Sequence, residues 1–342
     1  ARWPDDVDVT GRRVAVVGTG ASAMQVVPEI APIVDHLTVF QRTPQWARHV
    51  PLYDAPVDPD AHRLFEEVPY YDRWYRFAQA WRYGDGLLRF LRKDPDWPHP
   101  ERSLNRTNDR HRREMTDHLL AELDGRPDLV AKCLPDYPPF GKRILIDNGW
   151  FRTLRRPNVS LVSEPIECIE PDGIRTADGE LHPADVIVQA TGFRVTDLGD
   201  RLHLVGRDGV TLAEAWADDD PTAHLGITVP GFPNLFVMYG PNTNAGHGGS
   251  IMWLAETQSR YVAAALRLLA EGGHRSMEVR PEVCEAWTAH VDERHEELVW
   301  THPGVTTYYR NPAGKVRSPM PIRLVDYWQL TREPDPAEFF LG

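Results

Sequence analysis

The stretch that most constrains the fold is residues 12–42, which read RRVAVVGTGASAMQVVPEIAPIVDHLTVFQR. Residues 13–17 form a short run rich in β-branched apolar side chains, as expected for a buried parallel strand. A glycine-rich turn follows at once, and we expect a helix from about Ser22 and a second strand over residues 37–40. This order of strand, turn, helix and strand predicts a βαβ unit that binds a dinucleotide.

The glycine-rich turn is the expected binding site of a pyrophosphate. Gly18 permits the tight turn, Gly20 lets the backbone approach the anion, and Ala23 lets the helix lie close to the strand. The amide groups at the helix N-terminus then point at the anion. The alternative is a strand–helix turn that binds nothing. Six small residues make up this stretch: Gly18, Thr19, Gly20, Ala21, Ser22 and Ala23.

The end of the second strand indicates which dinucleotide is bound. An NAD site usually has Asp or Glu there, to accept a hydrogen bond from the ribose 2′-hydroxyl, whereas this chain has Gln41, Arg42 and Thr43. A carboxylate would repel a 2′-phosphate, and a guanidinium can bind one with two hydrogen bonds. We therefore predict NADPH over NADH, against the alternative that Arg42 is an ordinary solvated arginine.

Composition argues against several classes of protein. The 342 residues are enough for about two domains, and the net charge of −12 argues against a nucleic-acid surface. No apolar run approaches the roughly 18 residues of a membrane span. Cys133, Cys168 and Cys284 lie far apart, so we expect reduced thiols in a cytoplasmic protein. No metal site is expected, because the HEEL stretch at residues 295–298 lacks the HExxH spacing.

The middle of the chain is expected to interrupt the α/β unit. Trp74, Phe77, Ala78 and Trp81 recur at helical spacing, which predicts packing or the wall of a substrate pocket. Strand patterns then resume, with a buried strand near residues 185–190. The expected domains are residues 1–49 and 139–189 for the two parts of the NADP-binding domain, 50–138 for a helical insertion, and 190–342 for a third block.

The third block has a strand-like run over residues 234–239, a glycine-rich loop over residues 240–250 that contains Asn242, and a helix that stops at Gly272-Gly273. This order is expected to form a phosphate-binding or ring-binding edge, with a plain loop as the alternative. His247 and the two glycines after it resemble the oxyanion loop of some hydrolases. No GxSxG motif accompanies them, which argues against a hydrolase.

The candidate catalytic segment reads Phe140-Gly141-Lys142-Arg143. Adjacent side chains on an extended segment point in opposite directions. Lys142 is therefore expected to face the 2′-phosphate together with Arg42, while Arg143 faces a catalytic centre. A solvated surface pair is the alternative from these residues alone.

These motifs together resemble the class B flavoprotein monooxygenases, meaning Baeyer–Villiger monooxygenases and their flavin-containing monooxygenase relatives. The resemblance covers the chain from end to end and looks closest to the 4-hydroxyacetophenone monooxygenase branch. The matching segments are Trp3-Pro4, residues 11–14 with the glycine turn and Gln25, FQRTP at 40–44, residues 135–150 with FGKR, DVIVQATGF at 185–193, GFPNLF at 231–236, Gly240-Pro241 and GHGGS at 246–250.

The resemblance implies an enzyme that uses FAD and NADPH. NADPH would reduce FAD, the reduced flavin would take up O2 to give a C4a-peroxyflavin, and its attack on a ketone would give an ester. In this family the arginine that matches Arg143 is catalytic, because it stabilises the peroxyflavin and the tetrahedral adduct. The implied cofactor-binding residues are Gly18, Gly20, Ala21, Ser22, Ala23, Gln25, Arg42, Thr43, Lys142, Thr191, Gly192 and Asn242, of which Thr191 and Gly192 match a linker between the two cofactors.

The chain also departs from the family pattern. The family has an earlier glycine-rich motif for FAD, which this sequence lacks, and the fingerprint FxGxxxHxxxW followed by Pro or Asp survives only as Trp3-Pro4. We therefore expect an α/β protein with a Rossmann-type NADP domain and a helical insertion. Residues 190–342 would then be the C-terminal part of a second, FAD-binding α/β domain, whose N-terminal segment lies on the full-length protein. The alternatives are an N- or S-oxygenating flavin monooxygenase that acts on soft nucleophiles, and a non-catalytic NADP-binding remnant.

Overall fold

A computed structural model describes residues 3–51, 53, 55–193, 203–246 and 248–342, so the expectation for His247 lies outside the described residues. The chain forms two compact units. Unit 1 consists of Ala1–Asp54 and Asp109–Phe193, and unit 2 of Ala55–Asn108 and Arg194–Gly342. Over the described ranges, no helix has both the length and the apolar character needed to cross a membrane.

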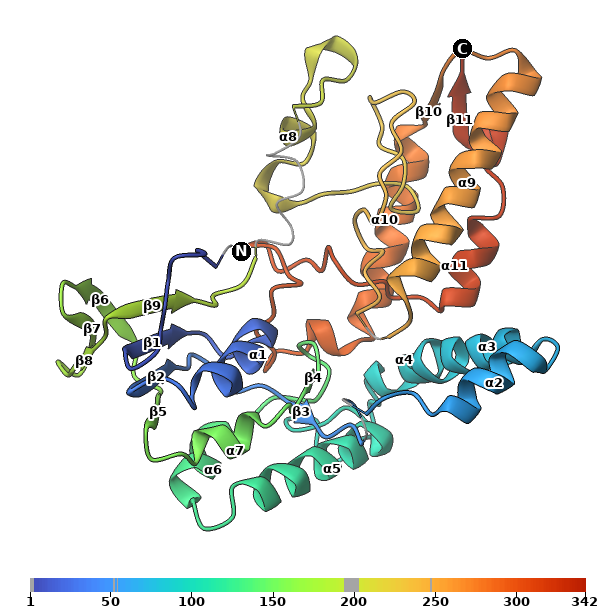
Figure 1. Ribbon diagram of the computed structural model, residues 1–342. Helices are drawn as coiled ribbons and strands as arrows, with labels where there is room; N and C mark the ends of the chain where they lie inside the picture. Colours follow the sequence, from blue (N-terminus) through green and yellow to red (C-terminus); the bar gives the residue numbers. More distant parts are fainter. Residues whose placement is uncertain (1–2, 52, 54, 194–202, 247) are drawn as a thin grey trace. The chain divides into compact units, whose positions relative to one another are not determined.

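Unit 1 is built on a four-stranded parallel sheet (Figure 1). The middle of β1 is a buried run of small and β-branched residues, which suits a strand that has neighbours on both sides. Because all four strands are parallel, their carboxyl ends meet at one edge of the sheet. The strand order is β5 (Val159–Val162), β2 (His36–Phe40), β1 (Arg13–Val17) and β9 (Val186–Gln189).

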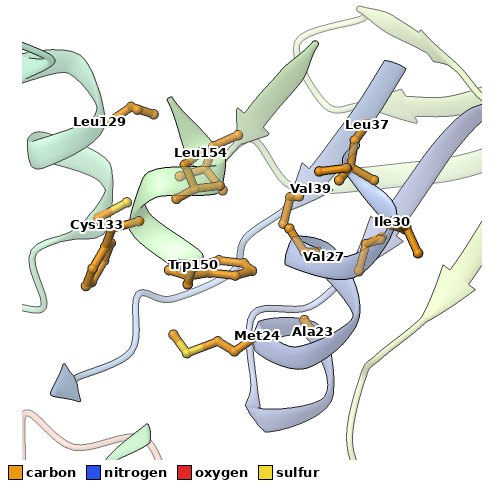
Figure 2. Packing of buried hydrophobic residues seen from close by; sticks show 14 of the residues in the cluster. Ala23, Met24, Val27, Ile30, Leu37, Val39, Leu129, Cys133, Trp150 and Leu154 are labelled. Carbon is orange, nitrogen blue, oxygen red and sulfur yellow. The ribbon is translucent and has the colours of Figure 1, made fainter. Parts of the chain in front are cut away.

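Helix α1 (Ala21–Ile30) connects β1 to β2 and packs its apolar face against the core of unit 1. Ala23 and Val27 on this face are fully buried. Trp150 and Leu154 of α7 (Trp150–Leu154) join the same cluster, as Figure 2 shows. The βαβ unit is therefore confirmed, with each of its elements within about one residue of the predicted position.

Smaller elements complete unit 1. Two short parallel strands join the segment after β2 to the segment that contains Lys142 and Arg143. A three-stranded antiparallel sheet has its turns near Asp172-Gly173 and Asp178-Gly179, and two helices precede residue 134. The elements are β3 (Ala47–Arg48), β4 (Leu145–Ile146), β6 (Ile166–Glu170), β7 (Gly173–Thr176), β8 (Leu181–Pro183), α5 (Arg106–Glu122), which begins in unit 2, and α6 (Pro127–Cys133).

Unit 2 is mainly helical. Its long helix α9 ends where Gly273 adopts a left-handed conformation with φ of 68°, as the predicted Gly-Gly stop requires. The strands β10 and β11 pair in antiparallel fashion. The elements are α2 (Pro59–Glu67), α3 (Tyr71–Tyr83), α4 (Asp85–Leu91), α8 (Leu212–Ala215), α9 (Ile251–Gly272), β10 (Met277–Val279), α10 (Pro281–Glu296), α11 (Leu324–Leu330) and β11 (Phe339–Leu341), with short 3₁₀ turns at Arg207–Gly209, Ala217–Asp219, Val299–Thr301 and Pro336–Glu338.

The strand predicted over residues 234–239 is wrong. Asn234 and Tyr239 both have positive φ, which breaks an extended run. Phe236 forms one isolated bridge to Thr228, and Asn234 binds the backbone of Met277 through both its N–H and its side-chain oxygen. Turn chemistry at both ends of the run therefore outweighs the strand propensity of the apolar residues between them.

The segment predicted to be a helical insertion is divided between the two units. Its helices form, but residues 55–108 group with unit 2, whereas residues 109–138 group with unit 1. Trp74, Phe77 and Trp81 on α3 are 59–70% exposed, so the packing expected for this aromatic stripe is not seen among the described residues. Helical spacing identified the helix correctly but did not show what its aromatic face contacts. The predicted domain boundaries themselves remain predictions.

Replacing Gly18 with alanine is expected to destabilise unit 1. Gly18 has φ of +113°, and a Cβ there would lie 2.4 Å from the carbonyl oxygen of Ala190. We expect the free energy of unfolding to fall by about 2–4 kcal/mol. Gly125 is the matched control, since its φ is +78° but a Cβ there would meet no atom within 4 Å. Gly125→Ala should cost only about 1–2 kcal/mol. Equal losses in urea unfolding curves would contradict the close approach.

Candidate dinucleotide-binding site

The N-terminus of α1 is suited to binding an anion. Gly20 is its N-cap residue and offers no side-chain hydrogen bond, and the first turn contains no acidic residue. A Cβ at Gly20 would meet no atom within 4 Å, so the space beside the turn is open. Amide groups at an uncapped helix N-terminus need a partner, and an anion supplies one. Ala21, Ser22 and Ala23 form the first turn itself.

A pair of cations lies at the carboxyl end of β2. Lys142 is half-buried, and its Nζ donates a hydrogen bond to Oγ1 of Thr43 at 2.6 Å. Arg42, the neighbour of Thr43, is exposed and acts on Lys142 electrostatically. The parallel pairing of β3 with β4 brings these segments together, although about 100 residues separate them in the chain. The structure therefore places Lys142, Thr43 and Arg42 close together, and their role in binding a 2′-phosphate stays a prediction.

The surroundings of Lys142 disfavour the charged form of its amine. Burial and the positive charge of Arg42 lower the pKa of Lys142 to about 8, while the Asp136 carboxylate acts in the opposite direction. Across the described ranges, no carboxylate forms a salt bridge with Lys142 or with Arg42. Two cations without a neutralising partner are an environment in which a phosphate is stabilised.

Two residues that support this site were not predicted. Thr19 is buried, and its hydroxyl donates to the carbonyl oxygen of Thr43 at 3.1 Å, which joins the glycine turn to the cation site. Tyr137 places its ring 4.7 Å below Nζ of Lys142. Thr19 occupies a variable position of the glycine motif, and nothing in the sequence pattern relates Tyr137 to residues near 42.

Two glutamines near the site donate hydrogen bonds from their side-chain amides to backbone carbonyl groups. Nε2 of Gln25 donates to the carbonyl oxygen of Ala21 at 3.0 Å, within α1. Nε2 of Gln41, which is buried, donates to the carbonyl oxygen of Lys132 at 2.7 Å and ties the end of β2 to α6. Gln25 thus lies beside the glycine turn, and its role in binding a cofactor stays a prediction.

Three further predicted residues also have defined places. Thr191 and Gly192 follow β9 at the carboxyl edge of the sheet, and Gly192 has φ of +95° with no atom near its Cβ position. Arg143 is exposed and follows Lys142 in unit 1. Their roles as linker and catalytic residue stay predictions.

Asn242 belongs to unit 2, where it is buried. Its Nδ2 lies 2.9 Å from the carbonyl oxygen of Val316, to which it donates, and 3.1 Å from Nε2 of His295. Its amide group is therefore engaged in the packing of the unit, and a contact with a cofactor stays a prediction.

The arrangement in unit 1 defines a class of protein. A central parallel strand leads through a glycine turn into a helix whose N-terminus lacks a side-chain cap, and the cation pair lies at the end of the adjacent strand. Rossmann-type domains bind dinucleotides in this way. Unit 1 therefore has a fold of the Rossmann type.

Comparison with known proteins shows that the chain is similar to monooxygenases. No family model matches the chain. An uncharacterized monooxygenase of Sinorhizobium fredii, y4iD, is 44% identical over 335 residues, which are 98% of this chain and 51% of that protein. A Baeyer–Villiger monooxygenase of Streptomyces coelicolor is 36% identical over 340 residues, which are 99% of this chain and 62% of that protein. The crystal structure of OTEMO in complex with FAD and NADP matches with a TM-score of 0.81 and 25% identity, over 99% of this chain and 68% of that one.

These similarities extend over nearly the whole chain, which is similar to proteins named Baeyer–Villiger monooxygenase and to the structures of steroid monooxygenase and OTEMO. It spans between half and two thirds of the length of these two curated relatives. Neither relative is named a 4-hydroxyacetophenone monooxygenase, so closeness to that branch stays a prediction.

Replacing Gly20 with alanine should weaken dinucleotide binding without destabilising the fold. Gly20 has φ of −78°, which alanine adopts readily, and its Cβ would point into open space. That space is where a pyrophosphate would approach the backbone. We expect a loss of binding of about tenfold or more and little change in melting temperature. Calorimetric titration with the dinucleotide measures the first effect, and unaltered binding would exclude the glycine turn as the anion site.

Proposed function

We propose that the protein is an NADPH- and FAD-dependent monooxygenase of the Baeyer–Villiger type, which converts a ketone and O2 into an ester. The observation that carries this proposal is the pair of cations, Arg42 and Lys142, at the strand end where an NAD site has a carboxylate. The names of the relatives and the presence of FAD and NADP in the structural neighbour support it.

The residues of unit 1 fit the adenosine part of NADPH. The pyrophosphate would bind at the uncapped N-terminus of α1, where Gly20 leaves room for it. The 2′-phosphate would accept hydrogen bonds from Arg42 and Lys142, and a guanidinium beside an ammonium matches the charge of a phosphate dianion. Thr43 orients the ammonium through its hydroxyl group.

FAD supplies the oxygen chemistry of such an enzyme when it is bound. Among its described residues, unit 2 contains no second unit of strand, glycine turn and helix on a parallel sheet like the one in unit 1. We therefore propose that the adenosine part of FAD binds to an N-terminal segment of the full-length protein. Thr191, Gly192 and Asn242 are proposed to contribute to cofactor binding from this chain.

Arg143 is the proposed catalytic residue. Oxygen transfer to a ketone places negative charge on the carbonyl oxygen of the substrate, and a fixed cation stabilises that charge in a site from which water is excluded. Arg143 is next to a lysine proposed to hold NADPH, so the same short segment would connect cofactor binding with catalysis. The substrate class is a small-molecule ketone. The proposed location is the cytoplasm, and the three cysteines are free thiols in the structure.

Product analysis with the full-length protein tests the proposed function. The protein would be supplied with FAD, NADPH and O2, together with either an aryl ketone or a thioether. We expect the ester from the ketone. Arg143→Ala should reduce ester formation about 10²–10³-fold, because an interaction with developing charge is lost. Arg152, an exposed arginine of α7, is the matched control. Sulfoxide as the sole product, or ester formation that does not depend on Arg143, would contradict the proposal.

The affinity for NADP⁺ is expected to depend on the charge of Lys142. In the protein without NADP⁺, the pKa of Lys142 is lowered to about 8. Binding of the phosphate favours the charged amine. Binding is therefore strongest below pH 8 and weakens by up to about tenfold for each pH unit above it. Lys142→Arg should remove this loss, because arginine stays protonated. Calorimetric titration with NADP⁺ at several pH values from about 6.5 to 9.5 measures this dependence. If the affinities of the wild-type protein and Lys142→Arg fall equally with pH, the charge of Lys142 is not the cause.

A further inference from the structure

The ammonium group of Lys142 has two neighbours that fix its position. Its Nζ donates to Oγ1 of Thr43, and it lies 4.7 Å from the centre of the Tyr137 ring. The face of an aromatic ring carries partial negative charge and attracts a cation. Tyr137 is only 4% exposed, so this ring is held in one place.

Tyr137 is attached to the segment that contains Arg42. Its hydroxyl group donates to the carbonyl oxygen of Pro44 at 3.0 Å. Its own carbonyl oxygen accepts a hydrogen bond from Nε1 of buried Trp46 at 2.8 Å. Burial raises the pKa of the Tyr137 phenol, so the hydroxyl group stays neutral and remains a donor. These two bonds join the Tyr137 segment to the chain immediately after Arg42 and Thr43.

The charged groups around Lys142 make this support necessary. Burial disfavours the charge of the ammonium group and Arg42 repels it, whereas the Asp136 carboxylate favours it. A lysine side chain has several rotatable bonds and would turn away from a second cation if nothing held it. The face of the Tyr137 ring and the Thr43 hydroxyl group keep the ammonium group in place. Neither neutralises its positive charge, which remains free to attract a phosphate.

We propose that Tyr137 is a positioning residue that makes the site selective for a 2′-phosphate, by holding the ammonium group of Lys142 beside Arg42. This inference rests on the proposed NADPH site. Tyr137 itself does not touch the cofactor, and it acts through Lys142. Because the ammonium group is already in place, less conformational entropy is lost when the phosphate binds.

The test compares the dissociation constants of NADP⁺ and NAD⁺ for variants at position 137. Tyr137→Leu removes the ring and should reduce the preference for NADP⁺ by roughly 3- to 30-fold, the range of a partly buried cation–π contact. The pH at which NADP⁺ binding weakens should also move below that of the wild-type protein, because the ammonium group loses its support. Tyr137→Phe keeps the ring and should retain the preference within about threefold.

Two further proteins separate positioning from a loss of structure. Trifluorophenylalanine at position 137 keeps the shape of phenylalanine but withdraws charge from the ring face, so it should lower the preference relative to Tyr137→Phe even if Tyr137→Leu does not fold. Phe340→Leu is the matched control, since it removes another aromatic ring under a cation, Arg280, in unit 2. It should leave the preference unchanged.

The outcomes distinguish the inference from the proposed function. A wild-type protein that binds NAD⁺ as well as NADP⁺ overturns both. If Arg42→Ala loses the preference but the leucine and fluorinated variants keep both the preference and the pH dependence, the NADPH site stands and the role of Tyr137 is rejected. Equal losses in Tyr137→Phe and the leucine variant would assign the effect to the hydroxyl group and also reject the role of the ring.

Discussion

The close approach of Gly18 to the backbone of Ala190 is the constraint on which the arrangement of unit 1 depends. The N–H of Gly18 donates to the carbonyl oxygen of Phe40 at 2.9 Å, so β1, β2 and β9 end at one place. At that place β1 leads into α1, β2 leads into Arg42, and β9 leads into Thr191. The backbone contacts of Gly18 with Ala190 and Phe40 therefore bring together the places where the predicted anion site, the cation pair and the expected linker begin.

The cation pair connects this geometry with the choice of cofactor. Arg42 and Lys142 repel each other, and the pKa of Lys142 is lowered to about 8 as a result of burial and of that repulsion. A phosphate dianion would offset both effects, whereas a ribose hydroxyl group would offset neither. The site is thus expected to discriminate between the two nicotinamide dinucleotides by charge. The supporting contacts from Thr43 and Tyr137 keep the lysine in the position where this discrimination is made.

Elements with a strong local signal were predictable from the sequence. The βαβ unit and the end of α9 at Gly273 follow from glycine positions that few other residues tolerate. The strand expected over residues 234–239 failed because positive φ at its two ends is not visible in an apolar pattern. Burial on α3 was not predictable either, because helical spacing identifies an apolar face but not its neighbour. The contacts of Lys142 with Thr43 and of Tyr137 with Pro44 depend on segments that are remote from each other in the chain, which no local pattern reveals.

The central claim is that Arg42 and Lys142 bind a 2′-phosphate as a dianion. The most direct measurement is the ³¹P NMR spectrum of NADP⁺ bound to the protein, followed as the pH is lowered from about 8 to 5. A free phosphate monoester takes up a proton near pH 6, as an approximate value. Two adjacent cations should lower that pKa, so we predict that the 2′-phosphate resonance of the complex stays constant to well below pH 6. A resonance that titrates as it does in free NADP⁺ would contradict this claim.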